Sequence, residues 1–273
     1  MPGLLITGSS GYLGSELTRR EPSATGTYLG SARPGGVRLD VRDADAVHRL
    51  VGELRPEAII HTAYREGGDA AEEVNVAGSH NVARAAAAVG ARLVHVSTDL
   101  VFDGALGRPY AEDDEPRPII EYGRQKLDAE LAVREALSEA LIVRTSLIYG
   151  GDEPSRHEAI ALDAAAGRAE MRFFRDELRN PVHVGDLARA LLELARSDLP
   201  GILHAAGADA VDRYEFACLA VTARGGDLDG LESALAAEHP TPRPLDCRLD
   251  SSRARARVAV PLRGVREVLA APG

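Results

Sequence analysis

The chain has a single lysine, Lys126, among its 32 lysine and arginine residues. A compact ammonium whose pKa can shift suits chemistry that a guanidinium cannot perform. Lys126 lies four residues after Tyr122 in a segment with helical spacing, so both side chains share one helix face. A cation beside a phenol lowers its pKa and makes tyrosine a proton donor or acceptor near neutral pH. The same spacing occurs on ordinary amphipathic helices, so the rest of the chain must decide between the two interpretations.

A glycine-rich turn follows the first predicted strand. Residues 4–7 are apolar, and Gly8, Gly11 and Gly14 come next at the spacing G-x-x-G-x-x-G, before a predicted helix over residues 15–20. Glycines at this spacing let the backbone approach a pyrophosphate at the N-terminus of the helix. The pattern therefore predicts a dinucleotide-binding turn and not only a tight turn.

The end of the second predicted strand, residues 24–28, indicates which dinucleotide binds. An NAD-selective site places a carboxylate there for the ribose 2′-hydroxyl, but Ser31 and Arg33 stand in this turn and no acid does. A hydroxyl and a guanidinium suit a 2′-phosphate, so we expect NADP(H) to be preferred, with NAD(H) as the alternative. Asp40, in the third predicted strand over residues 37–41, either faces the adenine or begins the next helix.

Strands and helices alternate at βαβ spacing over the first 150 residues. Further strands are predicted at residues 58–63, 92–97 and 141–146, with helices at 43–54, at 70–89 and around Tyr122. This alternation predicts an α/β fold with a doubly wound parallel sheet. Thr98 follows the fifth strand, at the sheet edge where ligands bind. We expect residues 1–150, joined by 180–206, to form the Rossmann domain, and residues 151–179 and 207–273 to form a smaller substrate lobe.

Composition argues against several classes of protein. The net charge of −10 and the pI near 5.3 argue against a nucleic-acid surface. Cys218 and Cys247 lack the spacing of a disulfide framework or a zinc site, and no metal site is indicated. The chain shows neither a membrane-spanning apolar run nor a secretory signal. We expect a cytoplasmic protein that binds small molecules; whether it forms a homo-oligomer stays open.

Four polar residues inside predicted strands and helices have less specific meanings. His61 ends a buried strand and His183 follows Asn180-Pro181-Val182, and for both a hydrogen-bonded structural role is favoured over catalysis. Asn75 and Asn81 interrupt an alanine-rich helix. They either tie neighbouring backbone together or are simply solvated.

Taken in order, the motifs resemble the extended short-chain dehydrogenase/reductase superfamily over essentially the whole chain. They are the glycine turn at residues 8–14, Ser97-Thr98-Asp99, Tyr122 with Lys126, and residues 144–150. Residues 97–104 are similar to the S-T-D-x-V-F-D-G motif of dTDP-4-dehydrorhamnose reductases, and residues 243–250 approximate their R-P-x-x-x-x-L-D pattern. The resemblance implies NADP(H)-dependent reduction of the 4-keto group of a nucleotide-activated deoxysugar.

The resemblance also implies roles for residues at matching positions. Thr98 and Tyr122 would bind the keto oxygen, Tyr122 would donate the proton, and Lys126 would hold the nicotinamide ribose and lower the pKa of Tyr122. Substrate contacts are expected from Asp99 and Leu147, with Arg175 and Arg243 chosen for the diphosphate. The cofactor would contact Gly8, Gly11, Tyr12, Leu13, Gly14, Arg33, Asp40, Val41, Thr62, Ala63, Tyr64, Tyr122 and Lys126.

The sequence departs from the reductase pattern in two places. Leu147 stands where these enzymes usually carry an aromatic residue, and residues 64–69 lack their usual threonine and acid, so a different keto substrate is an alternative. Leu100 replaces the glutamate that related dehydratases need, which argues against dehydration. Two other functions stay open: a non-catalytic, cofactor-binding regulatory subunit, as in methionine adenosyltransferase, and an epimerase with tightly held NAD. The missing carboxylate after Tyr28 counts against the epimerase.

Overall fold

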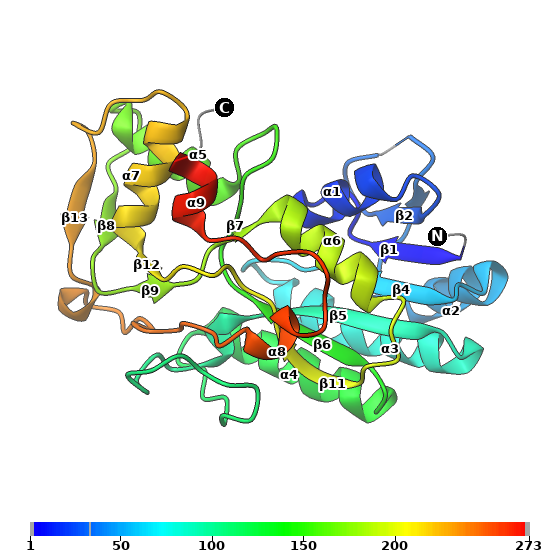
Figure 1. Cartoon of the computed structure of the whole chain (residues 1–273). Coiled ribbons are helices and arrows are strands. Elements are labelled where there is room, and N and C mark those ends of the chain that lie inside the picture. Colours follow the sequence, from blue (N-terminus) through cyan, green and yellow to red (C-terminus); the bar gives the residue numbers. More distant parts are fainter. Residues whose placement is uncertain (1–2, 33, 271–273) are drawn as a thin grey trace. The chain divides into compact units, whose positions relative to one another are not determined.

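The computed structural model describes residues 3–32 and 34–270 (Figure 1). Contacts divide the described residues into two compact units. Unit 1 comprises those within residues 1–98, 121–144 and 188–203, and unit 2 those within 99–120, 145–187 and 204–273. Residues 99–120, which the sequence analysis assigned to the Rossmann domain, are grouped with unit 2.

Unit 1 is built on a seven-stranded sheet. Its strands are β1 (Leu4–Thr7), β2 (Thr25–Tyr28), β3 (Val37–Arg38), β4 (Ala58–His61), β5 (Arg92–Thr98), β6 (Leu141–Thr145) and β11 (Gly201–His204). Their order across the sheet is β11-β6-β5-β4-β1-β2-β3, and β1 pairs in parallel with both β2 and β4. The chain thus winds outward from β1 in both directions. The predicted doubly wound parallel sheet is confirmed.

Helices cover both faces of this sheet. In Figure 1, α2 (Ala44–Leu54), α3 (Gly78–Val89) and α4 (Glu121–Ala136) lie on one face, and α1 (Tyr12–Arg20) and α6 (Val184–Leu194) on the other. Because both faces are covered, the central strands are continuous apolar runs: β1 and β4 are buried at every position. Leu5, Ile59 and Leu93 from three neighbouring strands share one core cluster with residues of α2 and α3.

Two predicted elements differ from those observed. The third strand was expected over residues 37–41 but ends at Arg38, because the Asp40 side chain accepts a hydrogen bond from the Arg42 backbone N–H and closes a turn. The helix expected over residues 70–89 is instead a π-helical turn, Glu73–Ala77, followed by α3.

Unit 2 contains short strands paired in twos, and helices. The pairs are β7 (Ile148–Tyr149) with β10 (Val182–His183), β9 (Leu178–Arg179) with β12 (Val211–Asp212), and β8 (Arg172–Phe174) with β13 (Glu232–Ala234). Its helices include α5 (Arg156–Ala165), α7 (Arg213–Ala223), α8 (Ser252–Arg255) and α9 (Val265–Ala270), with 3-10 turns at Asp99–Val101 and Ala236–Glu238. A capping box of Ser155 and Glu158 begins α5.

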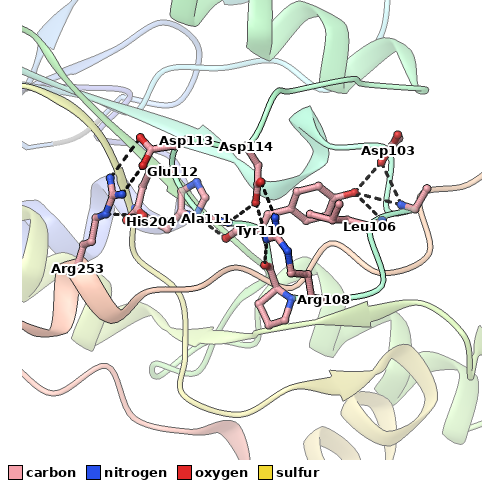
Figure 2. Close-up of polar contacts among 12 residues, drawn as sticks. Asp103, Leu106, Arg108, Tyr110, Ala111, Glu112, Asp113, Asp114, His204 and Arg253 are labelled. Atoms are coloured by element: carbon pink, nitrogen blue, oxygen red, sulfur yellow. Dashed lines mark hydrogen bonds and ion pairs between the residues drawn. The ribbon is translucent and has the colours of Figure 1, made fainter.

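The loop over residues 103–118 is fixed to the C-terminal motif within unit 2. Tyr110 lies at the centre of this contact, because its backbone N–H donates to the carbonyl of Arg248 and its carbonyl accepts from the N–H of Asp250. The Tyr110 hydroxyl donates to Asp103 Oδ1 at 2.6 Å within the loop (Figure 2). The Tyr110 ring stacks on Phe102 with centroids 4.0 Å apart. The carbonyl of Gly104 accepts from the Asp246 N–H. The two motifs that resemble the reductases, 97–104 and 243–250, therefore meet in the fold.

Gly104→Ala is expected to destabilise the protein more than Gly107→Ala. Both glycines have φ near the left-handed region, +76° and +72°, but a Cβ on Gly104 would lie 2.5 Å from the Leu245 nitrogen, whereas nothing lies within 4 Å of one on Gly107. We expect losses in unfolding free energy of about 3 kcal/mol or more and of about 1 kcal/mol, respectively. Urea unfolding measures both; equal losses would show that residues 244–246 do not constrain the loop.

Candidate functional site

The glycine turn brings three backbone segments into contact. Gly8 has φ +74°, and a Cβ on it would lie 2.7 Å from the Ala63 nitrogen; one on Gly14 would lie 2.2 Å from the Gly8 carbonyl oxygen. Gly11 is the N-cap of α1, whose first turn carries no acidic residue. A helix N-terminus with this close backbone approach attracts anions. Tyr12 is half-buried and Leu13 buried at the start of the same helix.

Helix α4 places Lys126 in the interior of unit 1. The Lys126 side chain is buried, and its Nζ donates to the Val96 carbonyl oxygen at 2.7 Å. Burial lowers the pKa of Lys126 to about 8, with the nearby Glu130 carboxylate opposing the shift. Val96 precedes by two residues the buried Thr98, which ends β5. The ammonium is therefore held at the strand end where Thr98 lies.

Tyr122 lies one helical turn before Lys126 on α4 and contacts the segment after β4. Its ring meets that of Tyr64 edge to face, with centroids 6.2 Å apart. Tyr64 is 56% exposed, whereas Tyr122 is half-buried. The segment that carries Tyr64 therefore lies against the ring that the sequence analysis predicts to donate the proton.

A buried ion pair lies one turn beyond Lys126. The Glu130 carboxylate accepts from Ser97 Oγ at 2.5 Å and from Arg144 Nη2 at 2.7 Å. Ser97, Glu130 and Arg144 are each at most 3% exposed. Ser97 and Arg144 belong to the motifs found in the sequence, whereas Glu130 was not predicted to have a role. The only sequence signal of Glu130 is its i,i+4 spacing from Lys126.

His61 has the structural role predicted for it. Its ring nitrogens hydrogen-bond with Thr7 Oγ1 at 2.6 Å and Ser79 Oγ at 3.0 Å. Burial, assisted by the charge of Lys126, lowers the pKa of His61 to about 3, so the ring is neutral at pH 7. His95 stacks on it with centroids 5.3 Å apart, and its pKa is also lowered by burial.

Asn75 and Asn81 both tie backbone segments together, as one of the two predicted interpretations had it. In the π-helical turn, buried Asn75 accepts from the Arg65 N–H and donates to the Arg65 carbonyl, both at 2.8 Å, and also donates to Gln125 Oε1. Asn81 Nδ2 donates to the carbonyl of Val41 at 3.0 Å. Asn75 thus links the chain following Tyr64 to α4.

The residues predicted to bind adenosine differ in burial and in their hydrogen-bond partners. The Asp40 carboxylate is bonded by Arg42 Nη2 at 2.6 Å, and this partner lowers its pKa. Val41 is buried against Gly78, and Thr62 Oγ1 donates to the Thr7 carbonyl. Arg33 lies outside the described residues. The cofactor contacts of these residues stay predictions.

Unit 2 has its own cavity of about 590 Å³. Arg213 lines it without a carboxylate ion pair among the residues that the structure describes, and its Nη2 lies 3.4 Å from His157 Nδ1. Burial and neighbouring arginines lower the pKa of Arg213 to about 10, so it stays charged at neutral pH. The remaining wall mixes charged and apolar groups: Ile160, Glu170, Met171, Arg172, Phe173, Phe174, Glu177, Ala234, Leu235, Glu238, His239, Pro240 and Arg243.

The two arginines predicted for the diphosphate have different positions. Arg243 lines the cavity, pairs with Glu177 and lies over the Phe174 ring at 5.0 Å. Arg175 is not among the lining residues; it stacks on Tyr214 at 3.9 Å and bonds Ser233. Arg213 was not predicted as a diphosphate ligand, because nothing distinguishes it from the many other arginines in the sequence.

Asp99 and Leu147, the other predicted substrate contacts, lie in unit 2. The buried Asp99 carboxylate accepts from Ser146 Oγ at 2.6 Å and faces Arg179 Nε at 3.8 Å. Leu147 is half-buried, and its carbonyl accepts from the Val182 N–H. Their substrate roles stay predictions.

Two further findings concern the described residues alone. They hold no group of three histidine, cysteine or acidic side chains arranged to bind a metal ion. None of the helices that they form has the length and apolar character needed to cross a membrane.

The fold and site together define a class. A doubly wound sheet, a glycine turn after β1, and a Tyr-x-x-x-Lys pair on the helix that follows the β5 threonine are features of the extended short-chain dehydrogenases/reductases.

Comparison with known proteins places the chain within this class. The family model described as RmlD substrate binding domain matches residues 1–271. A dTDP-4-dehydrorhamnose reductase of Mycolicibacterium smegmatis is 36% identical, over 97% of this chain and 83% of that protein. A crystal structure of dTDP-4-dehydrorhamnose reductase from Bacillus anthracis, in complex with NADP, is 27% identical with a TM-score of 0.84, over 98% and 96% of the two chains. The chain belongs to the RmlD substrate binding domain family.

The same comparison finds relatives with another name. Methionine adenosyltransferase 2 subunit beta of Rattus norvegicus is 34% identical, over 79% of this chain and 70% of that protein. The relatives of this chain therefore include proteins that are named as reductases and proteins that are named as subunits of another enzyme.

Asn75→Ala is expected to destabilise unit 1 more than Asn81→Ala. The first change removes three hydrogen bonds: the buried one to Gln125 and the two part-buried ones to the backbone of Arg65, which together should cost about 2–3 kcal/mol. Asn81 is half-buried and bonds two carbonyls, so its loss should cost about 1 kcal/mol. Chemical denaturation compares the two; an equal or smaller loss for Asn75→Ala would contradict the linking role of Asn75.

Proposed function

We propose that the chain is an NADP(H)-dependent reductase of the 4-keto group of a nucleotide-activated deoxysugar. The observation that carries this proposal is the placement of Lys126: the single lysine of the chain is buried and bonded to the Val96 carbonyl, two residues before Thr98. Burying an ammonium is costly, and its position one turn from Tyr122 suits it to stabilise a phenolate.

The residues of unit 1 have distinct roles in this reaction. Thr98 donates a hydrogen bond to the keto oxygen, and Tyr122 delivers the proton to that oxygen. Lys126 stabilises the phenolate that remains on Tyr122. A nicotinamide cofactor, when bound, supplies the hydride. Donors aimed at the oxygen where negative charge develops typically contribute 10²–10³-fold each to the rate.

The cofactor is NADP(H), with NAD(H) as the second choice. The turn over residues 8–14 fits a pyrophosphate, because a Cβ on Gly8 or Gly14 would collide with backbone that an unsubstituted glycine allows to approach. No acid ends β2 to select the NAD ribose. The Bacillus anthracis relative that was crystallised with NADP supports the same choice. We also propose that the reaction takes place in the cytoplasm, as the absence of a predicted membrane-spanning run or secretory signal led us to expect.

The cavity of unit 2 is the proposed site for the substrate diphosphate. Arg213 and Arg243 supply positive charge, and Arg213 has no carboxylate ion pair among the described residues. Phe173 and Phe174 supply aromatic surface for a nucleotide base. This replaces Arg175 with Arg213 as the second diphosphate ligand. The sugar itself and the stereochemistry of reduction are not specified by these contacts.

A second candidate function is a cofactor-binding regulatory subunit. The similarity to methionine adenosyltransferase 2 subunit beta favours it, and the glycine turn would serve either function. Turnover separates the two, because a regulatory subunit needs to bind the cofactor but not to transfer hydride.

Tyr122→Phe is expected to abolish reduction while leaving NADPH binding nearly unchanged. Loss of a general acid typically costs 10²–10⁴-fold in rate, and the phenol has no part in the glycine turn. The measurement is NADPH oxidation on addition of enzymatically generated dTDP-4-keto-deoxysugar, with NADPH affinity measured in parallel. Turnover retained by the variant would place the acid elsewhere. NADPH binding by the native protein without turnover of any 4-keto sugar would favour the regulatory subunit.

Arg213→Met is expected to raise the KM for the nucleotide sugar about 10–100-fold, because it removes one charged hydrogen bond to the diphosphate. The KM for NADPH should not change. Arg175→Met is the matched control, since Arg175 stacks on Tyr214 and is not one of the residues that line the cavity; its effect should stay below about threefold. Equal effects of the two variants would remove Arg213 from the proposed diphosphate site.

A further inference from the structure

We propose that Glu130 is a positioning residue that holds the Lys126 ammonium in its charged form against the end of β5. Its consequence for the reaction rests on the proposed function, whereas its effect on Lys126 itself does not.

One carboxylate connects the helix that carries Lys126 with two strands of the sheet, β5 and β6. Glu130 lies on α4, and its carboxylate accepts a hydrogen bond from Ser97 Oγ of β5 at 2.5 Å. The same carboxylate accepts from Nε of Arg144 on β6 at 3.0 Å and from its Nη2 at 2.7 Å. Ser97 is the residue between Val96, which accepts from Lys126, and Thr98. A change at Glu130 would therefore be transmitted to the strand end through a single side-chain contact.

The charges around Lys126 make Glu130 the group that favours the ammonium. His61 of β4 and His95 of β5 are buried and neutral at pH 7, so neither supplies negative charge. Arg144 of β6 is a cation paired with Glu130, and Tyr122 on α4 is the phenol of the proposed reaction. Glu130, one turn along α4 from Lys126, is the carboxylate that opposes the effect of burial on the pKa of Lys126.

The direction of the effect follows from these charges. Removing the negative charge of Glu130 lowers the pKa of Lys126 below its present value of about 8. The amine then becomes neutral at a lower pH, and a neutral amine does not stabilise a phenolate. The alkaline limb of the pH–activity profile should therefore move to lower pH, without a uniform loss of activity across the pH range.

The single lysine makes the effect on Lys126 directly measurable. Feeding lysine labelled with ¹³C and ¹⁵N to expressing cells gives one side-chain NMR signal, whose shift against pH is the titration of Lys126. The variants are Glu130→Gln, the charge-balanced Glu130→Gln with Arg144→Met, and Glu130→Asp. Glu135→Gln, an exposed exchange on the same helix, is the control.

We expect the Lys126 titration to move down by at least one pH unit in Glu130→Gln and to stay in place in Glu135→Gln. The Lys126 titration should move down less in the double variant than in Glu130→Gln, because the opposing charge of Arg144 is also gone. In Glu130→Asp, which keeps the negative charge, the titration should lie between those of Glu130→Gln and the native protein. If Glu130→Gln does not fold, the double variant carries the test, because it removes Arg144 together with its partner and so leaves no buried guanidinium without a carboxylate. An unchanged Lys126 titration in Glu130→Gln, or in the double variant if Glu130→Gln does not fold, would overturn the proposal.

The pH profile of kcat/KM with NADPH and keto sugar is the second measurement. The alkaline limb should shift by the same amount as the NMR titration in each variant. A uniform loss of activity with an unshifted limb would show that Glu130 is only structural and would overturn the proposal. Absence of turnover in every form, with the NMR shift present, would reject the reductase function and leave the role of Glu130 toward Lys126 intact.

Discussion

The interior of unit 1 is organised around the cost of burying one ammonium. Lys126 is bonded to a backbone carbonyl of β5, and Glu130 opposes the loss of its charge. Glu130 is in turn paired with Arg144, so two cations and one anion lie among α4, β5 and β6. Removing one partner of a buried pair typically destabilises a protein by about 3–5 kcal/mol. The packing of these three elements is therefore constrained by charge as much as by apolar contact.

The choice between lysine and arginine follows from geometry. Arg144 uses the planar fork of a guanidinium to bind one carboxylate through two nitrogens. At Lys126 the partner is a single carbonyl oxygen, to which a compact ammonium can donate, and burial lowers the pKa of that ammonium. A chain that uses 31 arginines elsewhere thus keeps its lysine at the place where an ammonium differs from a guanidinium in function.

The sheet and the glycine turn could be predicted because local patterns determine them. Apolar runs at βαβ spacing specify a covered parallel sheet, and Gly8 and Gly14 stand where no Cβ fits. The partners of Glu130 and the cavity around Arg213 depend on contacts between residues far apart in the chain, which one sequence does not specify. The π-helical turn was also missed, because the hydrogen bonds of Asn75 that accompany it connect separate segments.

The energetics of the site favour catalysis over binding alone. A regulatory subunit that only held a dinucleotide would use the glycine turn, and Lys126 as a ribose ligand, but would not need the Tyr122 phenol one turn before Lys126. Replacing a buried ion pair by apolar residues of similar size is often neutral or stabilising, so the charges around Lys126 are not explained by stability. Groups whose pKa values are shifted by burial and by specific partners are typical of sites that move protons. The arrangement of Lys126 one turn from Tyr122 is therefore better explained by turnover than by cofactor binding.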